Sequence, residues 1–136
     1  MEKKQVIGGR ILVGGVHPMP LSKAIRAGDW VFVSGQTAID ATGAVLAGGV
    51  EAQTRRVLEG IRAVLEEAGS ALTEVVKTTV WLADPRDFWS FNRVYAEFFP
   101  EAPPARSTVR ADLMLDCKVE IEALAYSPGA AVGGVR

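Results

Sequence analysis

The sequence predicts an α+β fold, a two-layer sandwich in which two helices pack on one face of a mixed sheet. Two segments have apolar residues at helical spacing, and short stretches rich in β-branched residues precede, separate and follow them. The expected order is strand, strand, helix, strand, helix, strand, strand, which is typical of helices gathered on one side of a single sheet. The chain has 136 residues and shows no repeat or linker, so we expect residues 1–136 to form a single domain.

The N-terminal part is predicted to be irregular at first and then to contain two strands. Residues 1–19 are interrupted by Gly and Pro and favour an irregular segment, with residues 11–13 at most a short edge strand. The turn signal at residues 27–29 separates two strand candidates, and the second of these is the β-rich stretch 30–34. Gly35 follows directly and predicts a bulge or a close approach of another group to the backbone.

The two helices have clear sequence signals. In the first, apolar residues recur at helical spacing, opposite a charged side: Val57, Leu58, Ile61, Val64, Leu65 and Ala68. Gly69 is placed to end this helix in a left-handed cap. A strand is expected at residues 75–82, which are dense in β-branched side chains. Asp84 and Pro85 then predict the start of the second helix, which ends near Pro100 and carries Phe88, Phe91, Tyr95 and Phe98.

Two more strands are predicted near the C-terminus, at residues 106–111 and 118–126, followed by a flexible tail at residues 127–136. One side of the last strand is small and apolar and suits the space beneath the helices: Val119, Ile121, Ala123 and Ala125. The other side mixes charged and apolar residues: Glu120, Glu122, Leu124 and Tyr126. The pattern leaves two explanations open, an oligomer interface that contains a polar pocket or an exposed face with two stray apolar residues.

The composition argues against several classes of partner. Fifteen Lys and Arg against sixteen Asp and Glu give a formal net charge of −1, and no basic run is present, so we expect no nucleic-acid partner. No apolar run approaches the roughly 20 residues that span a bilayer, and the N-terminus lacks the features of a signal peptide. We therefore expect a cytoplasmic protein with no membrane partner.

The sequence lacks the residues that most kinds of catalytic site need. His17 is the single histidine and Cys117 the single cysteine, so no metal site, disulfide or nucleophile triad is expected. Cys117 is interpreted as a small apolar filler. No glycine pair is followed by the Lys and Ser/Thr of a phosphate-binding loop, and we expect no cofactor.

The remaining candidates are Arg106 and Glu120. Arg106 follows two prolines, and its planar guanidinium suits bidentate binding of a small organic acid. A carboxylate such as that of Glu120 could activate water or transfer a proton to a leaving amine. The alternative is a structural cross-strand ion pair, which contributes little at a surface. The pattern alone leaves both explanations open.

Four stretches of the sequence resemble the Rid (YjgF/YER057c/UK114) family of imine and enamine deaminases, also labelled the endoribonuclease L-PSP family. They are AIRAGDWVFVSGQ, VVKTTVWLADPRDFWSFNRVYAEFF, PPARSTV and KVEIEALA, and the similarity runs from about residue 20 to residue 126. The resemblance implies a chorismate-mutase-like fold, assembled as a homotrimer with ligand clefts between subunits. It also implies that Arg106 binds the substrate carboxylate and that Glu120 helps to position the hydrolytic water. Ser34 and Asn92 match residues that line the cleft.

Two features depart from the archetypal branch of that family. Leu21 stands where that branch has a tyrosine, so the resemblance implies a more apolar pocket and a changed substrate. The loop at residues 100–104 is shorter than in that branch. Apart from these two departures, the resemblance implies that Thr108 lines the substrate site, as Leu21 does, at a position that is often cysteine in that branch.

The function implied by the resemblance is hydrolysis of a reactive imine or enamine of an amino acid or other small organic acid, giving a keto acid and ammonia without a cofactor. Its partner would be a small-molecule carboxylate substrate. Two alternatives stay open. One is a non-catalytic carboxylate-binding or regulatory protein that uses the same cleft. The other is a ribonuclease, which the near-neutral charge and the lack of a catalytic histidine pair argue against.

Overall fold

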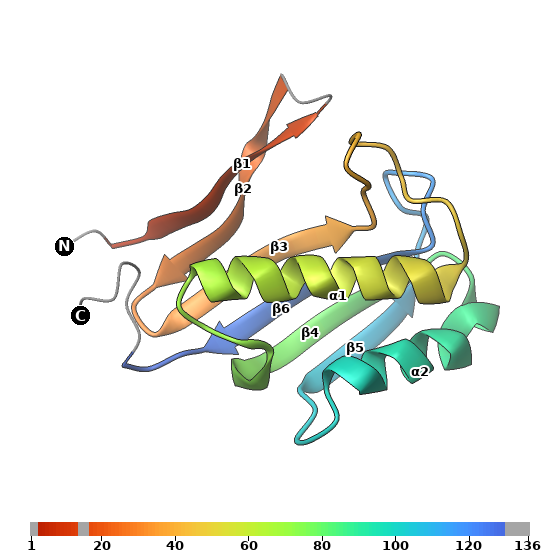
Figure 1. The fold of residues 1–136 in the computed structure, drawn as a ribbon. Coiled ribbons are helices and arrows are strands. Elements are labelled where there is room, and N and C mark those ends of the chain that lie inside the picture. The colour runs from red at the N-terminus through yellow and green to blue at the C-terminus, as the bar shows by residue number, and fades with distance from the viewer. Residues whose placement is uncertain (1–2, 14–16, 130–136) are drawn as a thin grey trace.

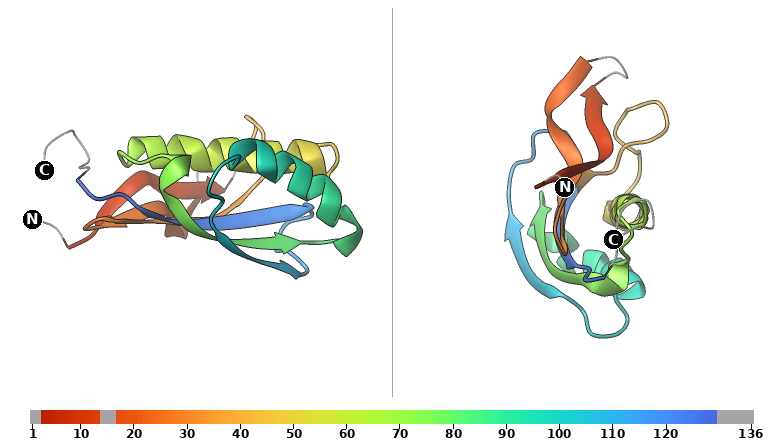
Figure 2. Two further views of the ribbon diagram at one scale, coloured as in Figure 1. Left: turned by 90° about the horizontal axis from the view of Figure 1, so that it is seen from below. Right: turned by 90° about the vertical axis from the view of Figure 1, so that its left-hand side faces the viewer.

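The computed structural model describes residues 3–13 and 17–129 of the chain. They form one six-stranded sheet with both α-helices on the same face, and the strand order is β1-β2-β3-β6-β4-β5 (Figures 1 and 2). Only β4 and β5 pair in parallel, so the sheet is mixed. The predicted α+β two-layer sandwich is confirmed. Its elements are β1 (Gln5–Val13), β2 (His17–Ala27), β3 (Trp30–Thr37), α1 (Val50–Glu67), η1 (Leu72–Glu74), β4 (Val75–Leu82), η2 (Pro85–Asp87), α2 (Phe88–Phe98), β5 (Ala105–Arg110) and β6 (Val119–Tyr126).

Both helices form where the sequence predicts them. After α1, Gly69 has a φ of +78°, and the next amide, that of Ser70, donates to the carbonyl of Leu65 at 2.8 Å. Asp84 accepts a hydrogen bond from the Arg86 amide at 2.9 Å and so begins the short 3₁₀ turn η2, which leads into α2. None of the helices in the described part of the chain is long and apolar enough to cross a membrane.

The prediction of an irregular segment at residues 1–19 is wrong, because β1 and the first half of β2 pair as antiparallel strands. Gly8 and Gly9 have φ angles of +75° and +70°, and they lie where the register of β1 shifts. The glycines therefore produce a bulge and do not end the strand. Pro18 and Pro20 fit within β2 because this half of the strand pairs with β1 alone.

The C-terminal boundary also differs from the prediction. The sequence predicts Ser127 in a flexible tail, but this residue is fully buried. Its amide donates to the Asp29 carbonyl at 2.7 Å and its hydroxyl to Glu74 at 2.9 Å. Residues 130–136 of the predicted tail lie outside the described residues.

The two faces of the sheet differ in what covers them. The inner face packs against the helices and forms the core. It includes the small, apolar side of β6 that the sequence predicts beneath the helices: Val119, Ile121, Ala123 and Ala125. The outer face has no helix (Figure 2). Four of its large apolar side chains keep 42–49% of their area exposed: Trp30, Phe32, Val76 and Tyr126. An outer face this apolar favours the interface explanation over a solvated surface.

Candidate functional site

The sheet separates the two principal site residues onto opposite faces. Arg106 in β5 pairs with Thr78 of β4, and Thr78 is buried beneath α2 on the inner face. Glu120 in β6 alternates with the buried residues Val119 and Ile121, so its side chain lies on the outer face. None of the ion pairs between described residues involves Arg106. A cross-strand Arg106–Glu120 pair within one chain is therefore excluded.

Arg106 belongs to β5, the edge strand of the sheet, which lies beside α2 (Figure 1). Its guanidinium carbon is 4.8 Å from the ring centre of Tyr95, 5.3 Å from that of Phe91 and 5.8 Å from that of Phe88. Burial raises the pKa of the Tyr95 phenol. Its hydrogen bond with Thr78 opposes this shift, as do the charge of Arg106 and hydrogen bonding with that side chain. The half-buried guanidinium of Arg106 thus lies against three aromatic rings of α2.

Two further predicted residues lie on the same side as Arg106. Thr108 is two residues along β5, so it shares the inner face, and its hydroxyl is buried without a hydrogen-bond partner among the described residues. Asn92 is half-buried on α2, where helical spacing places it between Phe88 and Tyr95. The structure therefore groups Arg106 with Asn92 and Thr108 between α2 and β5.

Glu120 occupies a niche that Gly35 provides. The pairing of β3 with β6 jumps from Val33↔Ala123 to Gln36↔Ile121, so β3 bulges at residues 34–35. A Cβ atom on Gly35 would overlap the Glu120 carboxylate. Both predicted consequences of Gly35, the bulge and the close approach, are confirmed. Burial, followed by the charge of Glu122, raises the pKa of Glu120 above its usual value.

Ser34 belongs to the same bulge. Its hydroxyl donates to the Ser22 carbonyl of β2 at 2.6 Å, which leaves the oxygen free to accept a hydrogen bond. Leu21 precedes Ser22 in the chain and keeps 37% of its area exposed. Glu120 and Ser34 thus form a second group, near Leu21, that is separate from the Arg106 group.

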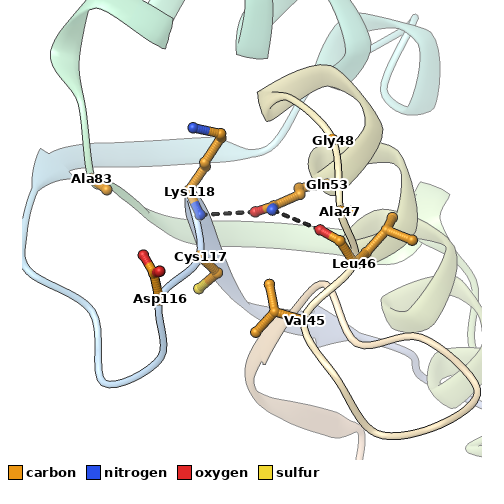
Figure 3. Close-up of a pocket in the computed structure, with 9 residues that line it drawn as sticks. All are labelled: Val45, Leu46, Ala47, Gly48, Gln53, Ala83, Asp116, Cys117 and Lys118. Carbon is orange, nitrogen blue, oxygen red and sulfur yellow. Dashed lines mark hydrogen bonds between the residues drawn. The ribbon is translucent and has the colours of Figure 1, made fainter.

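Two pockets among the described residues are lined by none of Arg106, Glu120 and Ser34. One of about 380 Å³ is lined mainly by the loop before α1 and by the segment just before β6 (Figure 3). Gln53 joins its two sides, since its amide nitrogen donates to the Leu46 carbonyl at 3.0 Å and its oxygen accepts from the Lys118 amide at 2.8 Å (Figure 3). Burial raises the pKa of the Cys117 thiol in this pocket, which suits the predicted filler role. A pocket of about 300 Å³ on the outer face includes Glu122.

Similarity to known proteins identifies the family. The model of the family described as endoribonuclease L-PSP matches residues 16–127. A RutC family protein of Pyrococcus abyssi is 49% identical over 109 residues, which cover 79% of this chain and 86% of that protein. Reactive Intermediate Deaminase A of Arabidopsis thaliana is 44% identical over 108 residues, 78% of this chain and 58% of that protein.

Comparison of the fold with solved structures identifies the same family. The structure of Escherichia coli TdcF, described as containing bound serine, superimposes with a TM-score of 0.79 at 34% identity and covers 90% of this chain and 98% of that one. The range that matches the family model, residues 16–127, contains both groups of site residues. The chain therefore belongs to the Rid family, also known as the endoribonuclease L-PSP family.

Proposed function

We propose that this protein is a cofactor-independent deaminase that hydrolyses reactive imines or enamines of small organic acids to keto acids and ammonia. The observation that carries the proposal is the pair of separate groups around Arg106 and Glu120. The first offers a half-buried guanidinium without a carboxylate partner among the described residues. The second offers a carboxyl group whose pKa is raised by burial.

The proposed active site needs two copies of the chain. Arg106 and Glu120 lie on opposite faces of one sheet, so one small substrate can reach both only if they come from different subunits. A contact between the β5 edge of one copy and the outer face of the next joins two different surfaces. Contacts of this kind form a ring when the rotation between neighbouring copies closes, and the family resemblance favours a homotrimer. The exposed apolar side chains of the outer face support such an interface.

The chemistry requires little beyond positioning. The Arg106 fork would hold the substrate carboxylate through two charge-assisted hydrogen bonds. Glu120 would accept a proton from water while the water oxygen bonds to the imine carbon and the C=N electron pair moves to nitrogen. Glu120 would then return the proton to nitrogen, which gives a carbinolamine. It would next carry the hydroxyl proton to the same nitrogen as the C=O bond forms, the C–N bond breaks and ammonia leaves. A raised pKa makes Glu120 a stronger base for the first step and keeps it suited to the second.

A second candidate is a non-catalytic protein that binds small carboxylates in the same cleft. The serine in the TdcF structure supports binding of a small amino or organic acid by this family. Both candidates require Arg106, but only the enzyme requires the basicity of Glu120. The presence of a carboxyl group in the Gly35 niche favours the enzyme.

The test is ammonia release from imines that an amino-acid oxidase generates in the assay. We expect the wild type to accelerate release and Glu120→Gln to lose this acceleration, while both bind benzoate with similar affinity in calorimetry. Benzoate binding without acceleration would favour the non-catalytic candidate. RNA incubated with nuclease-free protein should stay intact, because no histidine pair is available to cleave it.

A further inference from the structure

We infer that three rings at the start and middle of α2 act as positioning residues for the Arg106 guanidinium. We call them the aromatic cradle: Phe88, Phe91 and Tyr95. The inference rests on the proposed function, because it explains how the carboxylate-binding fork is held before the ligand arrives. These residues were predicted from the sequence only as the apolar side of a helix.

The cradle follows from helical spacing. Its three residues recur at intervals of three and four along the chain, so their rings form one stripe on α2. All three ring centres lie within 5.8 Å of the guanidinium carbon, inside the range of about 6 Å over which a cation is attracted to a ring face. Arg62, by comparison, lies over one ring, that of Phe98, at 4.9 Å.

The nearest ring of the cradle is itself fixed. The hydroxyls of Tyr95 and Thr78 share a hydrogen bond of 2.7 Å in the buried inner layer. The Tyr95 ring also packs between two neighbours, with centres 5.4 Å from Phe91 and 4.7 Å from Phe99. Phe91 is fully buried. Arg106 therefore rests against a surface that belongs to the packed core.

This arrangement restrains the arginine without ion pairing its donors. Rings attract the planar cation, whereas a carboxylate partner would occupy the N–H groups that a ligand needs. Among the described residues no ion pair engages Arg106. A fork held in place before binding loses less conformational freedom when the ligand arrives, and this increases affinity. The cradle should thus act on ligand affinity through Arg106.

The test compares Tyr95→Leu with Tyr95→Phe, which keeps the ring and removes only the hydroxyl. The probe is benzoate, measured by calorimetry on the assembled protein. We expect Tyr95→Leu to raise the Kd roughly threefold to tenfold, the range that follows from the strength of a partly desolvated cation–ring contact. Tyr95→Phe keeps the ring but loses the hydrogen bond to Thr78, so it should weaken benzoate binding clearly less than Tyr95→Leu does. For imine hydrolysis, KM should rise more than kcat falls in Tyr95→Leu.

The matched control is Phe98→Leu, which removes a ring of the same helix from beside a different arginine. It should lower the thermal midpoint without changing benzoate affinity. If Tyr95→Leu does not unfold cooperatively, Phe88→Leu serves as a second cradle variant. The Phe88 ring is only half-buried, so it contributes less to the core than the Tyr95 ring does. A cradle variant that folds should weaken benzoate binding clearly more than Phe98→Leu does.

Two results separate the cradle from the proposed function. Wild-type affinity in folded Tyr95→Leu and Phe88→Leu, together with lost binding in Arg106→Ala, would overturn the cradle and leave the function intact. Wild-type affinity in Arg106→Ala would overturn the proposed function itself. A double variant with Arg106→Lys adds a further check, because Tyr95→Leu should have a smaller effect once the planar fork is absent.

Discussion

Arg106 and Glu120 lie on opposite faces of a single sheet, Arg106 against the rings of α2 and Glu120 in the niche at Gly35. The separation follows from the strand registers. Arg106 pairs with the buried Thr78, whereas Glu120 falls between the buried residues Val119 and Ile121. Any site that uses both residues must therefore be shared between copies of the chain.

The first prediction is complementation between inactive variants. Arg106→Ala and Glu120→Gln should each lack imine hydrolysis alone but regain it when the two chains are unfolded together and reassembled. In an equal mixture about a quarter of the clefts would combine an intact Arg106 with an intact Glu120, if each cleft takes one residue from each neighbour. Ammonia release from the mixture should approach that fraction of wild-type activity.

Each variant unfolded and reassembled by itself is the control, and neither should recover. Recovery that fails although native mass spectrometry shows mixed oligomers would mean that the two residues do not share a cleft. The measurement thus tests the geometry independently of the identity of the natural substrate.

The second prediction concerns pH. Glu120 must be ionised to accept a proton from water, so activity should fall as the pH decreases through its raised pKa. Glu122→Gln removes a negative charge that contributes to this shift. The acid limb of the pH–rate profile should therefore move to lower pH in Glu122→Gln, with little change in the maximum rate. A profile that stays in place would show that Glu120 is not the titrating base.

The third prediction concerns Gly35→Ala, which introduces a Cβ atom where the Glu120 carboxylate lies. We expect the carboxylate to move and kcat to fall by at least about tenfold, since proton transfer depends on its position. Stability should change modestly, because a flexible side chain can shift. Gly49→Ala is the control, since no atom lies within 4 Å of the added methyl group. Equal activity in the two variants would argue against the niche.

The sequence predicts some of these relationships and misses others for physical reasons. The alternation around Glu120 is local, so its face and the bulge at Gly35 could be read directly. The face of Arg106 depends on how β5 pairs with β4, a distant segment, and no local pattern encodes that register. The hairpin of β1 and β2 was missed because the bulging glycines obscure strand alternation.

The fourth prediction concerns Arg26, a buried arginine that the sequence did not single out. Its side chain donates two hydrogen bonds to the Ala68 carbonyl at the end of α1, at 2.7 and 3.1 Å, and others to the carbonyls of Gly28 and Ser127. It thereby caps the helix and ties the C-terminal end of β6 to the turn after β2. Arg26→Ala should destabilise the protein by about 2–4 kcal/mol, because several buried carbonyls lose a charged donor.

Denaturant unfolding of Arg26→Ala and Arg56→Ala provides the comparison. Arg56 also donates to a backbone carbonyl, that of Ile39 at 3.1 Å, but it is exposed, so water can replace it. A loss in Arg26→Ala no larger than that in Arg56→Ala would contradict the capping role. Benzoate affinity should stay unchanged in both variants.

The last prediction is that Arg106→Lys impairs the site although it keeps the charge. The lysine ammonium cannot present a planar fork to a carboxylate or lie flat against the rings of Phe91 and Tyr95. Benzoate affinity should fall by roughly tenfold to a hundredfold, the equivalent of about 1–3 kcal/mol for a charge-assisted hydrogen bond left unmade. The assembly and the thermal midpoint should change little, because Arg106 forms no ion pair among the described residues. Calorimetry on wild type, Arg106→Lys and Arg106→Ala checks this order of affinities. Equal binding by wild type and Arg106→Lys would show that charge alone suffices, and then neither bidentate recognition nor the rings would be needed to explain the site.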